Sequence, residues 1–458
     1  MSGNRLILFA FWGPEIRLFV HSGLISSLLE SNPVTLVSRV IDGDFTDQIP
    51  PGCSLVKLPH LIPPRNLARL TTLANTAHGE YMSRMGFNRA LEGKAGQKQS
   101  YSVNQSIRRI LAKSLSYQIL VRVFSLIENR LLISWIKKVP DFYIQECELP
   151  NSILVTTDHP IALFCLQYFL MKGSKTLFLY SNWKDATRGI RARPCIQQHL
   201  VWSHSMSESV LRQNPRLPNT SIAIVGTPQF DNHLNMDIVW SREDFCSKFG
   251  LDPSRPVLCY TAASRRIIPN ESSLIKDLCD LIQCGKIIRN PQVIVRTNPT
   301  GSDPRIENLV SKYSFLRVVP AEWDFRPGLR DGQWQSAKNC DVDIFTNIIH
   351  HSAMNISAPS TVTLDFAISD KPIVNLAYDP PGPIEGQSIT TFVNQEVFKP
   401  AVQLGACQIV HTKNEMERVI NIYLSDPTID CEGRRAFVRS QLDETVGQSV
   451  SLIRSALI

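Results

Sequence analysis

Two hydroxyl side chains and a carboxylate lie close together in the sequence at Ser360, Thr361 and Asp365, directly after a short apolar run. Pro359 precedes them, and the residues that follow have the pattern of a helix. The first turn of a helix has unpaired backbone amides and a positive potential, so two hydroxyls there could help to hold a phosphate. Ser360 could equally be only the N-cap of that helix, and the sequence leaves both interpretations open.

Arginine and asparagine side chains follow two other apolar runs in the second half of the chain. Arg296 and Asn298 come at the end of PQVIVRTN, and Arg265 and Arg266 follow VLCYTAAS. A planar guanidinium can bind two phosphate oxygens at once. We therefore expect Arg296, Asn298 and Arg265 to contact a diphosphate. The alternatives are a surface ion pair for Arg296 and a solvated pair for Arg265 and Arg266.

Candidate acids and bases lie in the first half of the chain. Asp158 and His159 follow the apolar run SILVTT, and His21 lies in a helical pattern after LILFAFW. A histidine, with an ordinary pKa of about 6.5, or a carboxylate could take a proton from a reacting hydroxyl. Glu15 and Arg17 come just before His21 and are expected at the same site. The structural alternatives are a helix cap for Asp158 and a hydrogen-bonding helix residue for His21.

A metal site is not indicated by the sequence. The adjacent pair His350 and His351 would point in different directions on regular structure, and no carboxylate–histidine spacing recurs. The eleven cysteines form no Cys-x-x-Cys pair, and we expect them to be reduced thiols, mostly in the core. We therefore expect neither a metal nor another cofactor.

Alternating strand and helix patterns must position these residues. Short apolar runs alternate with helical periodicity in both halves of the chain, which predicts α/β domains with mostly parallel sheets. A length of 458 residues fits two such domains, and ligands bind at the carboxyl ends of their strands. The expected units are residues 1–232, residues 233–433 and a C-terminal helix at 434–458. The first domain is a candidate surface on which this helix could pack.

A basic helical section at 65–140 interrupts the first domain. It holds thirteen Lys and Arg against three Glu, a balance of +10, whereas the whole chain carries +7. Its charges indicate either a solvated helix surface or contact with an anionic membrane or a polyanionic acceptor. No apolar run reaches the length of a membrane span. We expect a cytoplasmic protein, for which the inner face of the cell membrane is a candidate contact.

Three segments are similar to GT-B glycosyltransferases, especially to the bacterial surface-polysaccharide and CDP-glycerol glycerophosphotransferase-like group. The first is NISAPSTVTLDFAISDKPIVNLAYD at 355–379, where a hydroxyl pair, a carboxylate and a Lys-Pro strand match at Ser360-Thr361, Asp365 and Lys371-Pro372. The second spans 181–231, and its matching landmarks are Trp183, Asp185, Trp202, Gly226, Pro228 and Phe230-Asp231. The third is VRTNP at 295–299, which resembles an Arg-x-His-Pro motif.

The resemblance implies the GT-B fold, with two Rossmann-like domains that face each other. It also implies a metal-independent transferase that moves a sugar or polyol phosphate from a nucleotide-activated donor, as in cell-surface polysaccharide synthesis. Ser360 and Thr361 would hold the donor diphosphate in the second domain. A glycan or lipid-linked acceptor would enter from the first domain, where Trp183 and Asp185 would line the acceptor site or the cleft. Nucleic acid is not an expected partner.

The chain departs from the group's pattern at three positions. Lys184 is inserted between Trp183 and Asp185, Gln229 stands where a basic residue is common, and Asn298 replaces the usual histidine. An asparagine can donate a hydrogen bond, but it brings no positive charge to a leaving diphosphate. Three alternatives therefore stay open: a CDP-glycerol-type glycerophosphotransferase, a nucleotide-sugar 2-epimerase and a non-catalytic GT-B-like binding protein.

Overall fold

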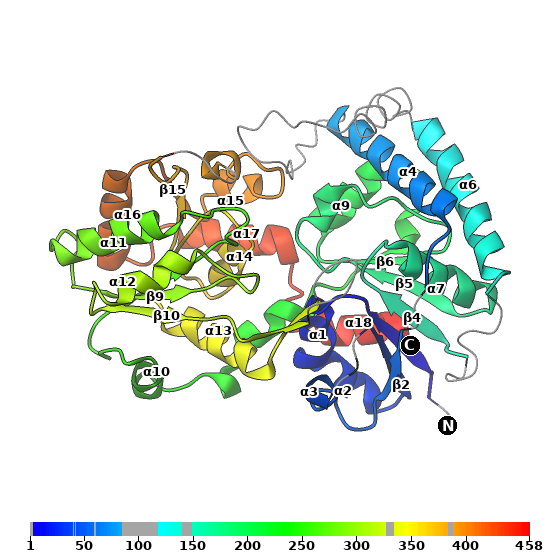
Figure 1. Cartoon of the computed structure of the whole chain (residues 1–458), viewed down its shortest axis with the longest axis horizontal. Helices are drawn as coiled ribbons and strands as arrows, with labels where there is room; N and C mark the ends of the chain where they lie inside the picture. Colours follow the sequence, from blue (N-terminus) through cyan, green and yellow to red (C-terminus); the bar gives the residue numbers. More distant parts are fainter. Residues whose placement is uncertain are drawn as a thin grey trace.

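Two parallel β-sheets with helices on their faces form the two halves of the molecule (Figure 1). The computed structural model describes residues 3–39, 41, 43–58, 61–84, 118–139, 149–326, 334–382 and 388–458. The predicted α/β class is confirmed. Part of the basic section, at 85–117 and 140, lies outside the described residues.

The first sheet has seven parallel strands in the order β3-β2-β1-β4-β5-β6-β7. Every residue of β1 is buried, which explains why the opening run is continuously apolar. The strand order reverses between β1 and β4, and ligands of open α/β sheets bind beside such a switch point. The strands are β1 (Leu6–Ala10), β2 (Val34–Ser38), β3 (Ser54–Lys57), β4 (Ser152–Val155), β5 (Lys175–Leu179), β6 (Gln198–Val201) and β7 (Ile222–Ile224).

Helices cover this sheet, and two long ones come from the basic section. They are α4 (Arg65–Arg84) and α6 (Gln118–Ile136), which pack on each other. Helix α7 (Pro160–Met171) is buried along most of its length because it lies against α6 as well as against β4 and β5. The other helices of this half are α1 (Pro14–Ile16), a π-helix (Arg17–His21), α2 (Leu24–Leu29), α3 (Gly43–Thr46), α8 (Asp185–Arg188), α9 (His204–Gln213) and a 3-10 turn (Asn219–Ser221).

The second sheet has six parallel strands in the order β10-β9-β8-β13-β14-β15, and its order reverses between β8 and β13. A separate antiparallel hairpin of β11 (Trp323–Arg326) and β12 (Trp334–Ala337) contacts α1 of the first half. The strands of the sheet are β8 (Val257–Thr261), β9 (Gln292–Arg296), β10 (Leu316–Val319), β13 (Met354–Ser357), β14 (Ile373–Leu376) and β15 (Gln408–Val410).

The helices of the second half begin with α10 (Arg242–Phe249) and α11 (Ser272–Gln283). Helix α11 shows a strongly amphipathic pattern, and its apolar face is buried against the sheet. The remaining helices are α12 (Glu307–Val310), α13 (Asn339–His351), α14 (Val362–Ile368), α15 (Lys399–Gln403) and α16 (Lys413–Ser425), with 3-10 turns at Pro304–Ile306 and Ile389–Thr391.

The chain crosses between the two halves twice. The first crossing is the hinge of 3-10 turns η3 (Pro228–Leu234) and η4 (Met236–Ile238). The second follows α17 (Cys431–Leu442), which packs on α14, α15 and α9, and leads to α18 (Ser449–Leu457). Helix α18 returns to the first half, where it packs on α2 and β4 and where Lys175 Nζ donates to the Ala456 carbonyl at 2.6 Å.

Gly226 lies where the two crossings touch. Its φ is +71°, and an added Cβ would lie 2.4 Å from Thr445 Oγ1 and 2.5 Å from Ser449 Oγ. Only glycine satisfies both the backbone conformation and the contact. The Gly-x-Pro sequence before the hinge is therefore explained by the returning C-terminal segment.

Among the described residues, no helix is both long and apolar enough to cross a bilayer. The ten cysteines in this part of the chain are free, and most are buried.

Gly226→Ala should destabilise the protein by about 2–5 kcal/mol. An alanine is strained at this positive φ, and its Cβ would also clash with Thr445 and Ser449. Gly285→Ala is the matched control, since Gly285 has φ +68° with nothing within 4 Å of the added Cβ. The control should lose only about 1–2 kcal/mol. Equal losses in chemical denaturation would show that the crossing contact does not constrain position 226.

Candidate active site

Glu15 is buried where the first sheet reverses its strand order. It is 4% exposed, and its two carboxyl oxygens accept hydrogen bonds from the Trp12 backbone N–H and from Thr156 Oγ1. Trp12 follows β1 and Thr156 follows β4, so the carboxyl group joins the two strands of the switch point. Burial disfavours the charged form and raises the pKa of Glu15 to about 8, although these hydrogen bonds oppose the shift.

Asp158 and His159 lie at the same edge of the sheet. The His159 ring meets the Trp12 ring edge-on, with centroids 6.0 Å apart. His159 Nδ1 accepts from the Ile161 N–H at 3.3 Å, so this histidine caps α7 and, when neutral, carries its proton on Nε2. Asp158 Oδ2 lies 3.7 Å from Arg193 Nη2, and its side chain remains 31% exposed. The structure therefore brings Glu15, Asp158 and His159 to one edge of the first sheet.

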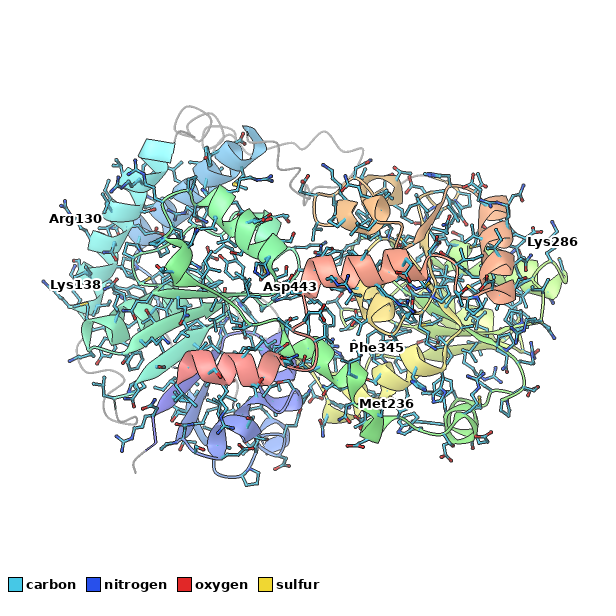
Figure 2. All side chains as sticks on the ribbon, turned by 180° about the vertical axis from the view of Figure 1, so that it is seen from behind. Arg130, Lys138, Met236, Lys286, Phe345 and Asp443 are labelled. Atoms are coloured by element: carbon cyan, nitrogen blue, oxygen red, sulfur yellow. The ribbon has the colours of Figure 1, made fainter. Side chains whose placement is uncertain are left out.

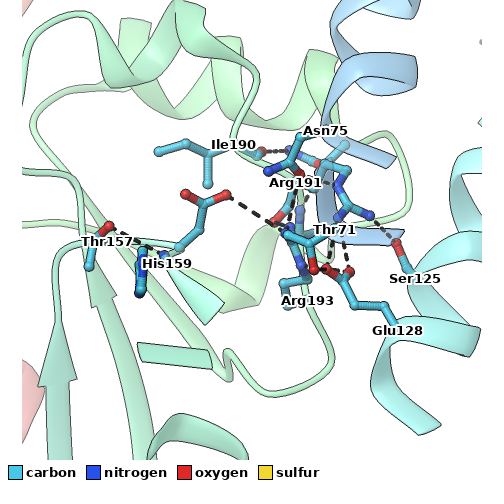
Figure 3. Close-up of polar contacts among 12 residues, drawn as sticks. Thr71, Asn75, Ser125, Glu128, Thr157, His159, Ile190, Arg191 and Arg193 are labelled. Carbon is cyan, nitrogen blue, oxygen red and sulfur yellow. Dashed lines mark hydrogen bonds and ion pairs between the residues drawn. The ribbon is translucent and has the colours of Figure 1, made fainter. Parts of the chain in front are cut away.

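A buried polar network connects this edge to the two helices of the basic section (Figure 3). Arg191 and Arg193 are both buried and share the carboxylate of Glu128, with Nη2 and Nε at 2.9 and 3.1 Å from Oε2. Thr71 Oγ1 donates to the other Glu128 oxygen at 2.7 Å. Burial alone would raise the pKa of Glu128, but the charges of Arg193 and Arg191 outweigh it and hold that pKa below its usual value.

This network was not predicted from the sequence. Glu128 is one of only three carboxylates among thirteen cations in the basic section, and this was the one available signal. Figure 3 shows Glu128 on one side of the two arginines and the strand end with Thr157 and His159 on the other. The basic section is therefore tied by ion pairs to the edge that carries Asp158.

His21 lies apart from these groups. Its Nε2 is 3.1 Å from Gln48 Oε1, and its carbonyl accepts from Asn232 Nδ2 at 3.3 Å. Burial, together with the charge of Arg17, lowers the pKa of His21, and the Gln48 contact opposes this. Arg17 Nη2 donates to the Gln229 carbonyl at 3.5 Å. The Arg17 side chain and the His21 carbonyl therefore contact the hinge, whereas the His21 ring contacts Gln48, as in the structural role that the sequence left open for His21.

Trp183 and Asp185 are buried, which corrects the expectation that they line an acceptor site or a cleft. The Trp183 ring packs between Phe398 and Phe437, and its Nε1 donates to Gln441 Oε1 at 2.7 Å. Asp185 Oδ2 accepts from the Asn182 N–H at 2.8 Å and so closes the loop after β5. The indole instead fills the contact between the two halves.

In the second half, a network of buried side chains fixes the turn after β13. Asn355 Nδ2 donates to Thr261 Oγ1 at 2.6 Å, which joins β13 to the end of β8. Asn375 Nδ2 donates to the Ser357 carbonyl at 3.3 Å, and Thr363 Oγ1 donates to Asn375 Oδ1 at 3.3 Å. Side chains from β8, β13 and β14 therefore fix the position of this turn.

This turn presents Ser360 and Thr361, which are half-buried. Within the described chain, their hydroxyls and the backbone N–H groups of Ser360, Thr361 and Val362 have no hydrogen-bond partner. Ser360 is therefore not used as an N-cap, which was the structural alternative for this residue. Two hydroxyls and three amides gather at the switch point of the second sheet, where an anion would be stabilised.

Two residues predicted for the donor site pair with other side chains of the protein instead. Arg296 is buried, with Nη2 paired to Asp341 and Nη1 donating to the Pro320 carbonyl at 2.5 Å. Asp365 is buried against the hinge, with Oδ1 2.8 Å from His233 Nε2. Both side chains are buried and paired with protein groups, so we correct the expectation that Arg296 and Asp365 contact the donor.

Asn298 and Arg265 lie on adjoining loops at the edge of the second sheet. Asn298 Oδ1 accepts from the Thr300 N–H at 2.9 Å, so the amide group holds its own loop. The Arg265 N–H donates to the Gly301 carbonyl at 2.9 Å, while its exposed guanidinium forms no ion pair with any described residue. Unlike Arg296, Arg265 therefore remains available to a ligand.

No protein-family model matches the sequence, and no curated protein matches it. Solved structures match over nearly the whole chain. A protein classed as a UDP-N-acetylglucosamine 2-epimerase from Listeria monocytogenes is 10% identical, covers 99% of this chain and 96% of its own, and has a TM-score of 0.53. UDP-GlcNAc 2-epimerase from Neisseria meningitidis, solved with UDP-GlcNAc bound, is 12% identical over 99% of each chain, with a TM-score of 0.50.

A glycosyltransferase from Rickettsia africae is 9% identical, over 100% of this chain and 99% of its own, with a TM-score of 0.49. The two epimerases have the GT-B fold, and the match with them over both halves defines the fold of this chain. The chain therefore has the GT-B fold, as the resemblance implied.

The pKa of Glu15 predicts a pH dependence of stability. Between the ordinary value of 4.5 and the raised value of about 8, the folded protein binds a proton that the unfolded chain does not. Stability should therefore fall as the pH rises through this window. Relative to wild type, Glu15→Gln should gain on the order of 3 kcal/mol between pH 5 and pH 8.

Chemical denaturation at several pH values measures this difference. Glu444→Gln is the control, because that side chain is 87% exposed and should show no such gain. A constant difference between Glu15→Gln and wild type across the window would mean that Glu15 titrates normally.

Proposed function

We propose that the protein is a transferase that moves a sugar or a polyol phosphate from a nucleotide-diphosphate donor to a glycan or lipid-linked acceptor, with sugar transfer as the first candidate. One observation carries the proposal. The turn after β13 holds two hydroxyls and three amides that have no partner among the described residues, at the switch point of the second sheet. Such a group of donors suits a diphosphate, and a negative charge that develops on the leaving nucleotide would be stabilised there: a nucleoside diphosphate in sugar transfer, a nucleoside monophosphate in polyol-phosphate transfer.

The donor site is completed by its neighbours. Arg265 follows β8, which pairs with β13, so its exposed guanidinium is available at the same edge as Ser360 and Thr361. Helix α14 begins at this turn and directs the positive end of its dipole at the site. The diphosphate would therefore be held by hydroxyls, amides and Arg265, without Arg296.

On the first domain, we propose Asp158 as the base that takes the proton of the acceptor hydroxyl. Its carboxylate is partly exposed, and Arg193 lies on one side of it at 3.7 Å. His159 is less suited to this role, because its Nδ1 accepts from the backbone and its Nε2 carries the proton in the neutral ring. Glu15, which is buried and has a raised pKa, would be mostly protonated at neutral pH.

A nucleotide-sugar 2-epimerase is the second candidate, because the epimerase structures from Listeria and Neisseria have this fold. Isomerisation of a donor sugar needs acid and base groups around that sugar. The buried carboxylates described in the second half are all engaged: Asp303 with Arg305 and Ser272, Asp341 with Arg296, Asp365 with His233, and Glu271 with Tyr260 and the Ala263 N–H. This arrangement favours transfer to a second substrate.

Removal of the two hydroxyls should weaken nucleotide-diphosphate binding. A hydrogen bond to a charged group contributes about 1.5–3 kcal/mol, so Ser360→Ala and Thr361→Val should each raise the Kd by about tenfold or more. Isothermal titration with UDP, GDP and CDP measures this. Ser247→Ala, an exposed serine on α10, should leave the Kd unchanged. Equal affinities for all three variants and wild type would contradict a diphosphate site at this turn.

Turnover separates the candidate functions. A thermal-shift panel of UDP-, GDP-, CDP- and CMP-linked donors should identify the donor through ligand-induced stabilisation. That donor should then be consumed at an appreciable rate only when an acceptor glycan or lipid-linked glycan is added. Asp158→Asn should lower kcat by about a hundredfold or more and leave the donor Kd unchanged. Epimerisation of the donor alone would identify an isomerase, and binding without turnover would identify a binding protein.

A further inference from the structure

Helix α6 exposes a row of aliphatic side chains on the outside of the first domain. Val123, Leu126 and Ile127 are 42%, 53% and 41% exposed. Their spacing of three and four residues places them on one face of the helix. Single exposed aliphatic residues are common on protein surfaces, whereas three neighbours on one helix form a patch.

The opposite face of α6 already packs on the protein. The Trp135 ring packs against Phe164 of α7 at a tilt, with ring centroids 4.6 Å apart, and Leu132 and Ile136 are buried. Glu128, also on the inner side, pairs with Arg191 and Arg193. The buried face of α6 is enough to pack this helix on the protein. The exposed aliphatic row on its outer face is therefore not explained by folding alone.

Exposed cations surround this aliphatic row. They are Arg122, Arg130, Lys137 and Lys138 on α6 and just beyond its end, with Arg65 and Arg69 on α4. The carboxylates described on 61–84 and 118–139 are Glu80, which is half-buried, and Glu128, which is neutralised by its two arginines. Figure 2 shows Arg130 and Lys138 at the outer end of the first domain, with Lys286 at the opposite end of the molecule.

We propose that the outer face of α6 docks on the surface of an anionic phospholipid bilayer. Val123, Leu126 and Ile127 would enter the boundary between headgroups and acyl chains, and the flanking cations would contact lipid phosphates. An interfacial helix of this kind uses apolar burial and charge attraction together. A nucleic acid would satisfy the cations but would leave the aliphatic side chains without a partner. The proposal concerns a different surface from the donor site and does not require transferase activity.

Co-sedimentation of the full chain with lipid vesicles tests the proposal. The protein should bind vesicles of equal parts phosphatidylcholine and phosphatidylglycerol, bind phosphatidylcholine alone much more weakly, and dissociate as salt is added. Each cation near an anionic surface is worth about fivefold in partitioning, so Arg130→Glu/Lys137→Glu should lower binding by at least about tenfold. Leu126→Ser/Ile127→Ser, which keeps the charge, should also lower it severalfold.

The matched control is Lys286→Glu/Arg418→Glu, which makes the same change of charge at a surface hollow that both residues line, and Figure 2 shows Lys286 at the opposite end of the molecule. It should leave vesicle binding nearly unchanged. An equal loss in the control would overturn the proposal and leave only an effect of net charge. Failure to bind anionic vesicles, or equal binding to phosphatidylcholine, would overturn it as well.

Sedimentation velocity provides a further test. A dimer that Leu126→Ser/Ile127→Ser dissociates would show that a second copy of the chain covers the patch, which overturns the proposal. Circular dichroism and the nucleotide Kd should be the same for all these variants as for wild type. Vesicle binding and nucleotide binding can then fail independently, so the docking surface and the proposed function are tested separately.

Discussion

The pair of His233 and Asp365 connects the hinge to the helix that begins at the proposed donor turn. Nε2 and Oδ1 are 2.8 Å apart, and both side chains are buried. A polar pair out of contact with water holds its geometry, because separating the partners leaves each one unsatisfied. The position of α14 relative to the first domain therefore depends on this contact. Together with α17, which packs on both α14 and α9, it fixes the hydroxyls at 360 and 361 with respect to the acceptor side.

Ionisable groups in this molecule divide into those that hold the structure and those that remain available. Arg296, Asp341, Glu128, Arg191 and Glu271 are buried and paired with other protein groups. Asp158, Arg265 and the hydroxyls of the donor turn keep exposed or unpaired polar atoms at the strand ends. This division supports the assignment of the available set to substrates and explains why a motif that matches by residue type can still be structural.

The fold was largely predictable from the sequence because it depends on local patterns. The runs at β1, β4, β9 and β13 are short and apolar, and a buried parallel strand needs that composition. The turn at Ser360 was also found, because proline and hydroxyl residues after such a run indicate a helix start. The antiparallel hairpin and the separation of α17 from α18 were not predicted, since neither has a strong periodic signal.

The roles of several site residues could not be predicted, because distant partners decide them. Arg296 turns inward because Asp341 comes from α13, and Trp183 is buried because Phe398 and Phe437 belong to the other half of the molecule. Glu128 meets Arg191 across 63 residues of sequence. A sequence pattern gives the residue type at a strand end, but the direction of the side chain depends on such contacts.

The return of α18 places the two ends of the described chain side by side, with Asn4 Nδ2 donating to the Ile458 carbonyl at 3.0 Å. The first domain is consequently discontinuous, and a fragment that stops at the hinge would lack the helix that covers α2 and β4. A circular permutant that joins residue 458 to residue 4 and opens the chain between α17 and α18 would make this domain one uninterrupted segment. The two halves would then be linked covalently through the hinge alone.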